Sequence, residues 1–310
     1  MSKPFFYCSE LSRQRGEPKY GTASVGDVWL LVEYPFWWGA QAFHDSALTD
    51  EVKTYLTAAL ASIPRARLLL IKQDYPRRAQ IKFFVVRSRP REPFIAEFTL
   101  DTYEQLLQLD IAAAASGQLN AAGVRRTEPL FLVCTHGRRD KCCAKFGYLL
   151  YKNLRAGGEA NVWQSSHVGG DRFAANLVCF PHGLFYAHMT DTDAQTILTA
   201  YRERRLVLNK FRGRACYPHT VQAAEYFIRA EANLDGLDDL RLLARERLAE
   251  TSWRIRFAAP MNRSVYDVIV SSRVSASHQY LTCDATREKS VEQFNLDDYR
   301  VTHDRARTQA

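Results

Sequence analysis

Residues 129–147 read PLFLVCTHGRRDKCCAKFG: a short apolar strand, a charged loop and the beginning of a helix-like pattern. A strand that leads through a loop into a helix is typical of an α/β unit. Three cysteines (Cys134, Cys142 and Cys143) and one histidine (His136) fall within this stretch. The loop is therefore a candidate for a metal or cluster site, a redox pair of thiols or a packed turn.

Hydrophobic periodicity predicts regular elements on both sides of this stretch. Upstream we expect a strand in 27–39, a helix over 49–64, strands at 66–73, 80–88 and 93–100, a helix over 101–110 and a linker over 111–129. Downstream we expect a helix over 141–158, strands at 161–166, 174–180 and 184–190, and a helix over 191–205. Then come helices over 220–231 and 237–250, strands at 253–259 and 264–272, and a frayed tail from 297. The two halves share one order of elements, which indicates an internal duplication of a single α/β unit.

The length of the chain fits this division. A chain of 310 residues is long for one simple domain and suggests about two. We place the first unit at 1–120, the second at 121–210, and a C-terminal α+β extension of helices and strands at 211–310. The first unit has no cysteine in the corresponding loop, so we expect the thiol chemistry in the second unit alone.

The cysteines and the charge limit the classes of function. The N-terminal residues lack the apolar core of a signal peptide, and no stretch approaches the ~18 apolar residues that span a bilayer. We therefore expect a cytoplasmic protein without a membrane partner. Its seven clustered cysteines would stay reduced and serve metal or redox chemistry rather than disulfides. The net charge of +8 is mixed with acids along the chain, which fits an acidic protein partner rather than a nucleic acid.

Four side chains of the second unit form a candidate metal site. Cys134 ends a strand and Cys143 opens the following helix, where cations and the helix N-terminus favour the thiolate form that binds metal. The stretch SSHVGGDRFA (165–174) adds His167 and Asp171 around a Gly-Gly pair, which lets the backbone approach a bound group closely. Two thiolates, an imidazole and a carboxylate make a set of four ligands. The Cys-x8-Cys loop differs from the Cys-x2-Cys spacing of common zinc sites.

The sequence resembles the sucrase/ferredoxin-like family, whose cluster-bearing part is a thioredoxin-like ferredoxin domain. The matching stretches are CSELSRQRGEPKYGTA (8–23), WLLVEYPFWWG (29–39), VCTHGRRDKCCAKFG (133–147), SHVGGDRFAANLVCFPHGLFYAHMT (166–190) and RGRACYPHTVQAAEYFIR (212–229). The resemblance implies thioredoxin-like α/β units and a [2Fe–2S] cluster held by two cysteines and two histidines. The cysteines correspond to Cys134 and Cys143. The first histidine of an H-x-G-G-H pattern corresponds to His167.

The chain departs from the family pattern at the second histidine, because this position is Asp171. We expect its carboxylate to take the place of the histidine, so that Cys134 and Cys143 hold one iron while His167 and Asp171 hold the other. A hard anionic ligand would lower the reduction potential and couple it to fewer protons than two histidines would. Two alternatives stay open: another residue supplies the fourth ligand, or the cluster is labile or lost. The candidates for a substitute ligand are Cys142, His136, His182 and His188.

The function implied by the resemblance is one-electron transfer with a redox partner protein as donor or acceptor, an oxidoreductase-type carrier rather than a hydrolase. No dinucleotide fingerprint and no pair of carboxylates typical of glycosidases stands out. The rival hypotheses are a labile-cluster redox or iron sensor, a thiol oxidoreductase without a cluster, and a structural zinc site.

Several residues near these motifs are expected to be structural. Cys142 is expected to be a buried structural thiol and Cys179 a core residue, and no role is assigned to Cys8, Cys216 and Cys283. Arg212 and Arg214 of the FRGR stretch either bind an anion or brace the cluster-bearing unit.

Overall fold

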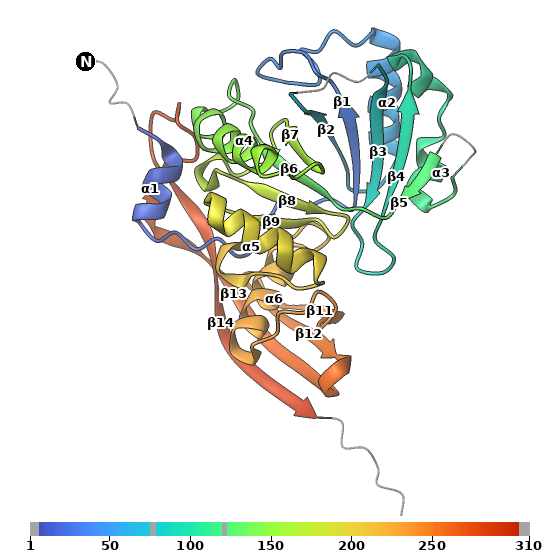
Figure 1. Ribbon diagram of the computed structural model, residues 1–310. Helices are drawn as coiled ribbons and strands as arrows, with labels where there is room; N and C mark the ends of the chain where they lie inside the picture. Colours follow the sequence, from blue (N-terminus) through green and yellow to red (C-terminus); the bar gives the residue numbers. More distant parts are fainter. Residues whose placement is uncertain (1–5, 75–78, 120–122, 304–310) are drawn as a thin grey trace, which may run out of the picture.

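A ten-stranded mixed sheet runs through the molecule, and a four-stranded antiparallel sheet lies beside it (Figure 1). The structure is a computed structural model that describes residues 6–74, 79–119 and 123–303. The large sheet has the strand order β10-β9-β8-β6-β7-β2-β1-β3-β4-β5, and the small sheet has the order β11-β12-β13-β14. The prediction of a mixed α/β protein is confirmed.

The first half of the large sheet is built around β1. Its strands are β1 (Val28–Glu33), β2 (Ala66–Lys72), β3 (Ile81–Arg87), β4 (Phe94–Leu100) and β5 (Gly123–Arg126). β1 pairs in parallel with β2, across helix α2 (Asp50–Ser62), and antiparallel with β3. The side chain of Thr49 accepts the N–H of Val52 and caps α2 at its predicted start. The predicted helix over 101–110 is a shorter 3₁₀ helix, η1 (Tyr103–Gln108), and the predicted linker contains helix α3 (Ile111–Ser116) and β5.

The second half repeats the strand order of the first. Its strands are β6 (Leu130–Cys134), β7 (Val162–Ser165), β8 (Leu177–Phe180), β9 (Leu184–Tyr186) and β10 (Phe211–Arg214). β6 pairs in parallel with β7, across helix α4 (Tyr148–Ala156), and antiparallel with β8. Helix α5 (Asp191–Arg202) follows β9. The two halves join where β2 pairs antiparallel with β7. This repeated order agrees with an internal duplication, but the duplication, the thioredoxin-like character of the units and the domain boundaries stay predictions.

The C-terminal part corrects two predictions. Helix α6 (His219–Ala232) packs on the small sheet, whose strands are β11 (Arg241–Ala249), β12 (Ser252–Ala259), β13 (Ser264–Gln279) and β14 (Lys289–His303). The prediction of a helix over 237–250 is wrong, because pairing with β12 outweighs the helix propensity of this Leu-, Arg- and Glu-rich segment. The prediction of a frayed tail from residue 297 is also wrong up to His303, because Asp298 to His303 continue β14 and pair with β13. Residues 304–310 lie outside the described residues.

The thiol-bearing loop is enclosed by one of the apolar cores. This core contains Trp29, Leu132 and Phe180 of the large sheet together with Cys8, Cys134, Cys142, Cys143 and Cys283. Helix α1 (Cys8–Gln14) lies beside the hairpin that joins β13 to β14, and Arg15 donates a hydrogen bond to the carbonyl of His278. Segments from both ends of the chain therefore cover the loop. Within the described segments, none of the helices has the length and apolar character needed to cross a membrane.

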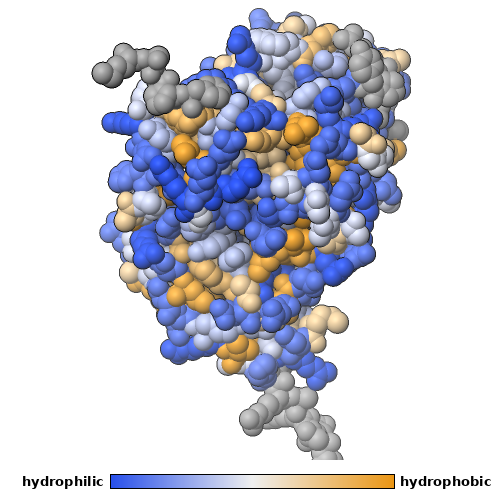
Figure 2. Space-filling model, turned by 60° about the vertical axis from the view of Figure 1, so that its left-hand side comes forward, coloured by the Kyte–Doolittle hydropathy of each residue, from blue (hydrophilic) through white to orange (hydrophobic). Residues whose placement is uncertain are grey.

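The face that carries α1 and the β13–β14 hairpin is mainly hydrophilic, and its hydrophobic residues form separate small patches (Figure 2). A protein that docked on this face would therefore meet charged groups around limited apolar areas.

A buried carboxylate connects the large sheet to the C-terminal part. Oε1 of Glu225 in α6 lies 2.8 Å from Nε of Arg214 in β10 and 3.0 Å from Nη2 of Arg229, and all three side chains are buried. Arg229 also donates to the carbonyls of Leu234 and Gly236, in the turn that leads to β11. Arg214 therefore braces the fold, which is one of the two roles predicted for it.

Replacing this carboxylate should destabilise the fold strongly. Glu225→Ala leaves two buried guanidinium groups without a counter-charge, and we expect the free energy of unfolding to fall by about 3–5 kcal/mol. Urea denaturation measures the loss, with Glu231→Ala, an exposed glutamate of the same helix, as the control. Equal losses in the two variants would show that Glu225 has no special role.

Candidate metal centre

A close backbone contact brings Cys134 and Cys143 together. Cys134 is the last residue of β6, and Cys143 begins η2 (Cys143–Gly147), a π-helical turn that leads into α4. A Cβ atom at Gly147 would lie 1.9 Å from the carbonyl oxygen of Cys134, so only glycine permits this approach. The two sulfur atoms are 3.4 Å apart and both side chains are buried.

The second pair of candidate ligands comes from the loop after β7. His167 lies in this loop, and Asp171 begins the 3₁₀ turn η3 (Asp171–Phe173). Between them, Gly169 and Gly170 have φ values of +93° and +81°, the left-handed region that glycine adopts without strain. The loop therefore turns sharply enough to bring both side chains to the same side.

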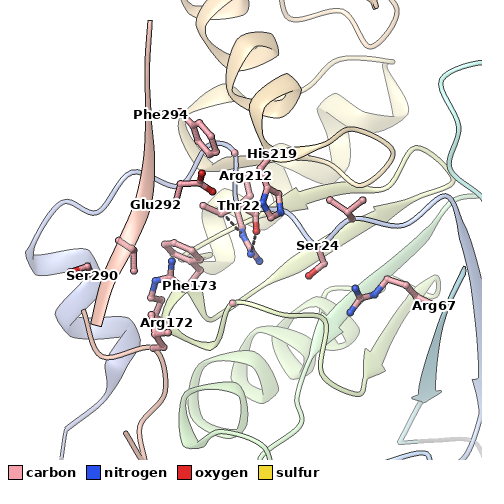
Figure 3. Close-up of a pocket in the computed structure, with 15 residues that line it drawn as sticks. Thr22, Ser24, Arg67, Arg172, Phe173, Arg212, His219, Ser290, Glu292 and Phe294 are labelled. Atoms are coloured by element: carbon pink, nitrogen blue, oxygen red, sulfur yellow. Dashed lines mark hydrogen bonds between the residues drawn. The ribbon is translucent and has the colours of Figure 1, made fainter. Parts of the chain in front are cut away.

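Arg212 of β10 fixes this loop in place through hydrogen bonds. Its buried guanidinium donates to the carbonyl of Gly169 at 3.0 Å and to Oδ1 of Asn176 at 2.8 Å. It also donates to the backbone carbonyl and the side-chain hydroxyl of Thr22 (Figure 3). Asn176 in turn donates to the carbonyl of Gly170, at 2.9 Å. Arg212 thus braces the loop that carries His167 and Asp171.

A pocket of about 610 Å³ opens beside this loop (Figure 3). Its lining includes the guanidinium groups of Arg67, Arg172 and Arg212 and one carboxylate, that of Glu292. Arg172 forms an ion pair with Glu17, with Nε and Oε1 2.7 Å apart. The excess of cationic groups makes the pocket suited to an anionic group next to the candidate centre.

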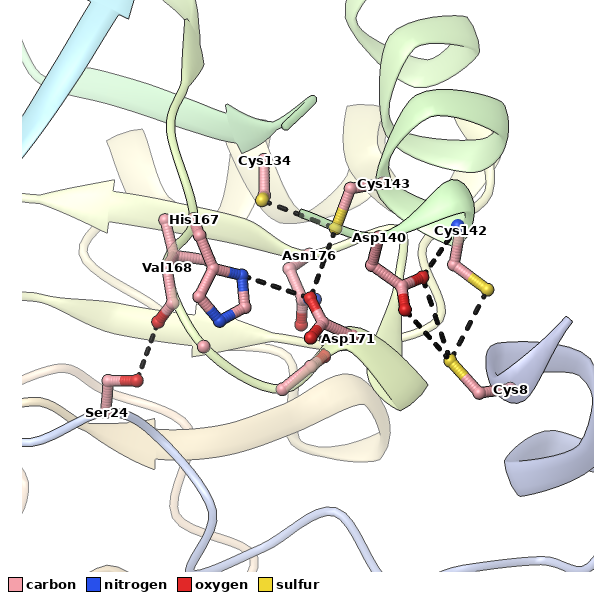
Figure 4. Close-up of polar contacts among 12 residues, drawn as sticks. Cys8, Ser24, Cys134, Asp140, Cys142, Cys143, His167, Val168, Asp171 and Asn176 are labelled. Carbon is pink, nitrogen blue, oxygen red and sulfur yellow. Dashed lines mark hydrogen bonds and ion pairs between the residues drawn. The ribbon is translucent and has the colours of Figure 1, made fainter. Parts of the chain in front are cut away.

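The structure brings Cys134, Cys143 and His167 together and places Asp171 beside His167 and Cys143 (Figure 4). The sulfur atoms of Cys134 and Cys143 and a ring nitrogen of His167 all lie within 4.8 Å of one another. Oδ1 of Asp171 lies 3.0 Å from Nδ1 of His167 and 3.7 Å from Sγ of Cys143. A tetrahedral ion with metal–sulfur bonds of ~2.3 Å holds two sulfur ligands about 3.8 Å apart. The donor types and their spacing therefore fit a metal centre.

Without metal, these groups stabilise one another's charges. The hydrogen bond between the two sulfur atoms lowers the pKa of the Cys134 thiol well below its usual range, and the same contact together with burial raises the pKa of Cys143. Burial lowers the pKa of His167, but Asp171 and Cys134 outweigh it and raise the pKa to about 9. Metal binding would displace the protons that Cys143 and His167 retain.

The histidines considered as substitute ligands have other contacts. Nε2 of His136 lies 2.6 Å from the carbonyl oxygen of Gly39, while Nδ1 of His182 lies 2.6 Å from the Tyr201 hydroxyl. Nδ1 of His188 lies 3.3 Å from the Ser9 hydroxyl. Burial lowers the pKa of His182 and His188 to about 3, so both are neutral packed side chains.

Cys142 belongs to a different group from its neighbour Cys143. Its sulfur lies 3.6 Å from that of Cys8 and 3.2 Å from that of Cys283, next to the carboxylate of Asp140. We call Cys8, Asp140, Cys142 and Cys283 the second thiol group. Sequence reasoning missed it, since no local motif links positions so far apart. Only Cys142 of this group lies in the cysteine-rich stretch 133–147, so no sequence pattern pointed to Cys8 and Cys283.

The fold and the site together define an α/β protein with a buried candidate metal centre of two thiols, an imidazole and a carboxylate. The chain belongs to the sucrase/ferredoxin-like family, whose model matches residues 19–213. The resemblance seen in the sequence is thereby confirmed.

Among curated proteins, the chain is similar to "Altered inheritance of mitochondria protein 32" of Meyerozyma guilliermondii, with 31% identity over 98 residues. This match covers 28% of the present chain and 35% of the relative, so the chain spans about a third of the relative's length. No solved structure gives a significant match.

The brace on the Gly-Gly loop predicts a specific effect of Gly170→Ala. The new Cβ would lie 2.5 Å from Nη2 of Arg212, whose hydrogen bonds hold it in place, so the loop must shift and its metal affinity should fall. Gly158→Ala is a matched control, because Gly158 has a similar φ of +88° but open space around it. Both variants share a backbone penalty of roughly 1–2 kcal/mol.

Equilibrium titration with iron or zinc, under anaerobic conditions, compares the two variants. We expect Gly158→Ala to bind metal at the Cys134–Cys143 centre as the wild type does, and Gly170→Ala to bind at least tenfold more weakly. Equal affinities would contradict the role given to Arg212.

Proposed function

We propose that the chain carries a [2Fe–2S] cluster and transfers single electrons, with Cys134 and Cys143 on one iron and His167 and Asp171 on the other. One observation supports the proposal most: these four donors, from two separate loops, converge at the positions where the resemblance to the family implies the ligands. When bound, such a cluster supplies a group that gains and loses one electron. The side chains of this chain determine how that group is held and reached.

The protein shields the centre unevenly. The two cysteines and Asp171 are buried, whereas the side chain of His167 is 26% exposed. The cysteine side is therefore protected from water and oxidants by the apolar core. The His167 side is the route by which a partner would approach most closely.

Asp171 sets the charge of the centre. A carboxylate adds a negative charge that a neutral histidine would not, which favours the oxidised state and lowers the reduction potential. Arg212, which braces the loop and interacts with Asp171, offsets part of this charge.

The basic pocket beside the loop supports an acidic redox partner. Arg67, Arg172 and Arg212 line it together with Gly170 of the ligand loop. An acidic group of a partner protein, or a small anionic acceptor, would be drawn to this side of the centre. We therefore propose docking over the pocket and the exposed edge of His167.

A structural zinc ion is the second candidate for this centre. The contacts of 3.4 Å between the sulfurs, 3.0 Å between His167 and Asp171, and 3.7 Å between Asp171 and Cys143 are compact enough for one tetrahedral ion. Zinc would hold the two loops together without redox chemistry.

Anaerobic purification with iron and sulfide analysis separates these functions. We expect about two irons and two sulfides per chain and an EPR signal on reduction, all lost in Cys134→Ala. Cys179→Ala, which removes a buried thiol of a different core, should keep the cluster. Zinc without sulfide that is lost in Cys134→Ala but kept in Cys179→Ala would support the structural ion at this centre. Reversible loss of iron in air with altered partner binding would support a sensor, and dithiol exchange without iron would support a thiol enzyme.

The role of Asp171 predicts the properties of Asp171→His. Because a neutral ligand replaces an anionic one, the midpoint potential should rise, and it should fall with increasing pH where the added imidazole titrates. Asp238→His, at an exposed carboxylate paired with Arg204, is the control and should leave the potential unchanged. Identical EPR spectra and potentials for wild type and Asp171→His would remove Asp171 from the ligand set.

A further inference from the structure

The second thiol group joins three segments that are far apart in the sequence. Cys8 begins helix α1, Cys142 precedes η2, and Cys283 lies in the connection between β13 and β14. Cys8 and Cys142 are separated by 134 positions, and Cys142 and Cys283 by 141. Such a convergence of three thiols results from the tertiary fold and not from a local motif.

The geometry of this group is that of a single metal site. The sulfur–sulfur distances are 3.6 Å between Cys8 and Cys142, 3.2 Å between Cys142 and Cys283, and 3.7 Å between Cys283 and Cys8. Oδ1 of Asp140 lies 3.1 Å from the sulfur of Cys283 and 3.8 Å from that of Cys8. Sulfur ligands of one tetrahedral ion lie about 3.8 Å apart, and a sulfur and an oxygen ligand about 3.5 Å apart.

We propose that Cys8, Asp140, Cys142 and Cys283 bind one zinc ion, in a site separate from the Cys134–Cys143 centre. Three thiolates and one carboxylate oxygen are ligands that zinc accepts in tetrahedral geometry. All four donor atoms lie within 4.8 Å of one another, a spacing that one tetrahedral ion can bridge.

The surroundings support ligation rather than simple packing. Cys8, Asp140, Cys142 and Cys283 are at most 5% exposed. A buried carboxylate among thiols is costly unless a cation compensates it, and within the described residues Asp140 forms no salt bridge with Lys or Arg. Its oxygens accept the backbone N–H groups of Cys142 at 2.8 Å and Cys283 at 2.7 Å, which fixes the carboxylate in place. Oδ1 also accepts a hydrogen bond from the thiol of Cys283, at 3.1 Å. Loss of that thiol proton on metal binding would leave a lone pair of Oδ1 for the ion.

A neighbouring backbone group also suits a thiolate. The N–H of Ser9 points at the sulfur of Cys142, 3.4 Å away, and such donors stabilise a charged sulfur. No disulfide links the cysteines, all of which lie within described segments. A disulfide between any two members of the group would leave the third without a partner, whereas one ion uses all three.

The ion would fasten both ends of the chain to the loop between Cys134 and Cys143. Exposed ion pairs already link the same segments: Lys141 with Asp284, Lys145 with Glu10 and Arg15 with Glu288. Exposed pairs of this kind contribute little stability each. A metal that closes loops of more than a hundred residues restricts the unfolded chain far more. Because Cys142 precedes Cys143, the same ion would also hold the backbone of the first centre.

Zinc analysis of the full chain tests this proposal independently of the cluster. In a Cys134→Ala/His167→Ala background, which removes two donors of the first centre, we expect about one zinc per chain. Adding Cys8→Ala or Cys283→Ala should abolish this zinc. Adding Cys216→Ala, a buried thiol outside both groups, is the matched control and should retain it. Cobalt in place of zinc should give a thiolate-to-cobalt absorption band with the same dependence on the variants.

A conservative variant covers the case in which the alanine variants do not fold. Asp140→Asn keeps the shape of the side chain, and we expect it to bind zinc at least tenfold more weakly in competition with a chromophoric chelator. Circular dichroism reports whether each variant is folded.

Three outcomes would overturn the proposal: a folded background chain that binds no zinc, a disulfide within the group seen by mass spectrometry, or iron and sulfide that disappear with Cys283→Ala in that background. If the wild-type chain binds zinc at this group but contains no iron, the proposed electron transfer is contradicted, whereas the zinc site is supported.

Discussion

The contact between Gly147 and the carbonyl of Cys134 is the constraint on which the site depends. Any side chain at Gly147 would collide with the end of β6, so the first turn of the following helix can reach the strand only with glycine there. This approach sets the 3.4 Å separation of Cys134 and Cys143. It also directs the preceding residue, Cys142, to the other side of the loop, where it meets Cys8 (Figure 4).

Arg212 fixes the position of the second loop, which carries His167 and Asp171. Its hydrogen bonds to Gly169, Asn176 and Thr22 connect β10, the Gly-Gly turn and the N-terminal segment. Burial lowers the pKa of Arg212 to about 9, so these acceptors are needed to keep a charged group in the interior. One buried cation thereby links the placement of His167 and Asp171 to the rest of the fold.

The sequence predicted those parts of the structure that depend on local signals. Alternating and periodic apolar residues indicated most strands and α2, and Thr49 indicated where α2 begins. The segment 237–250 was mistaken for a helix because its strand character comes from the partner strand β12, which lies outside any local window. The second thiol group was missed for the same reason, since Cys8 and Cys283 are 275 positions apart. The four candidate ligands of the first centre were found because each pair lies in one short motif.

The loop between β6 and α4 contributes donors to both groups. Cys134 and Cys143 face His167 and Asp171, whereas Asp140 and Cys142 face the segments near the two termini. In this description the first of these groups holds a pair of irons. Anomalous diffraction at the iron edge, from crystals grown without oxygen, would locate them. We predict two iron peaks, one beside the cysteine sulfurs and one beside His167 and Asp171. A single zinc ion at the centre of the four side chains, or no metal there, would exclude a [2Fe–2S] cluster at this centre.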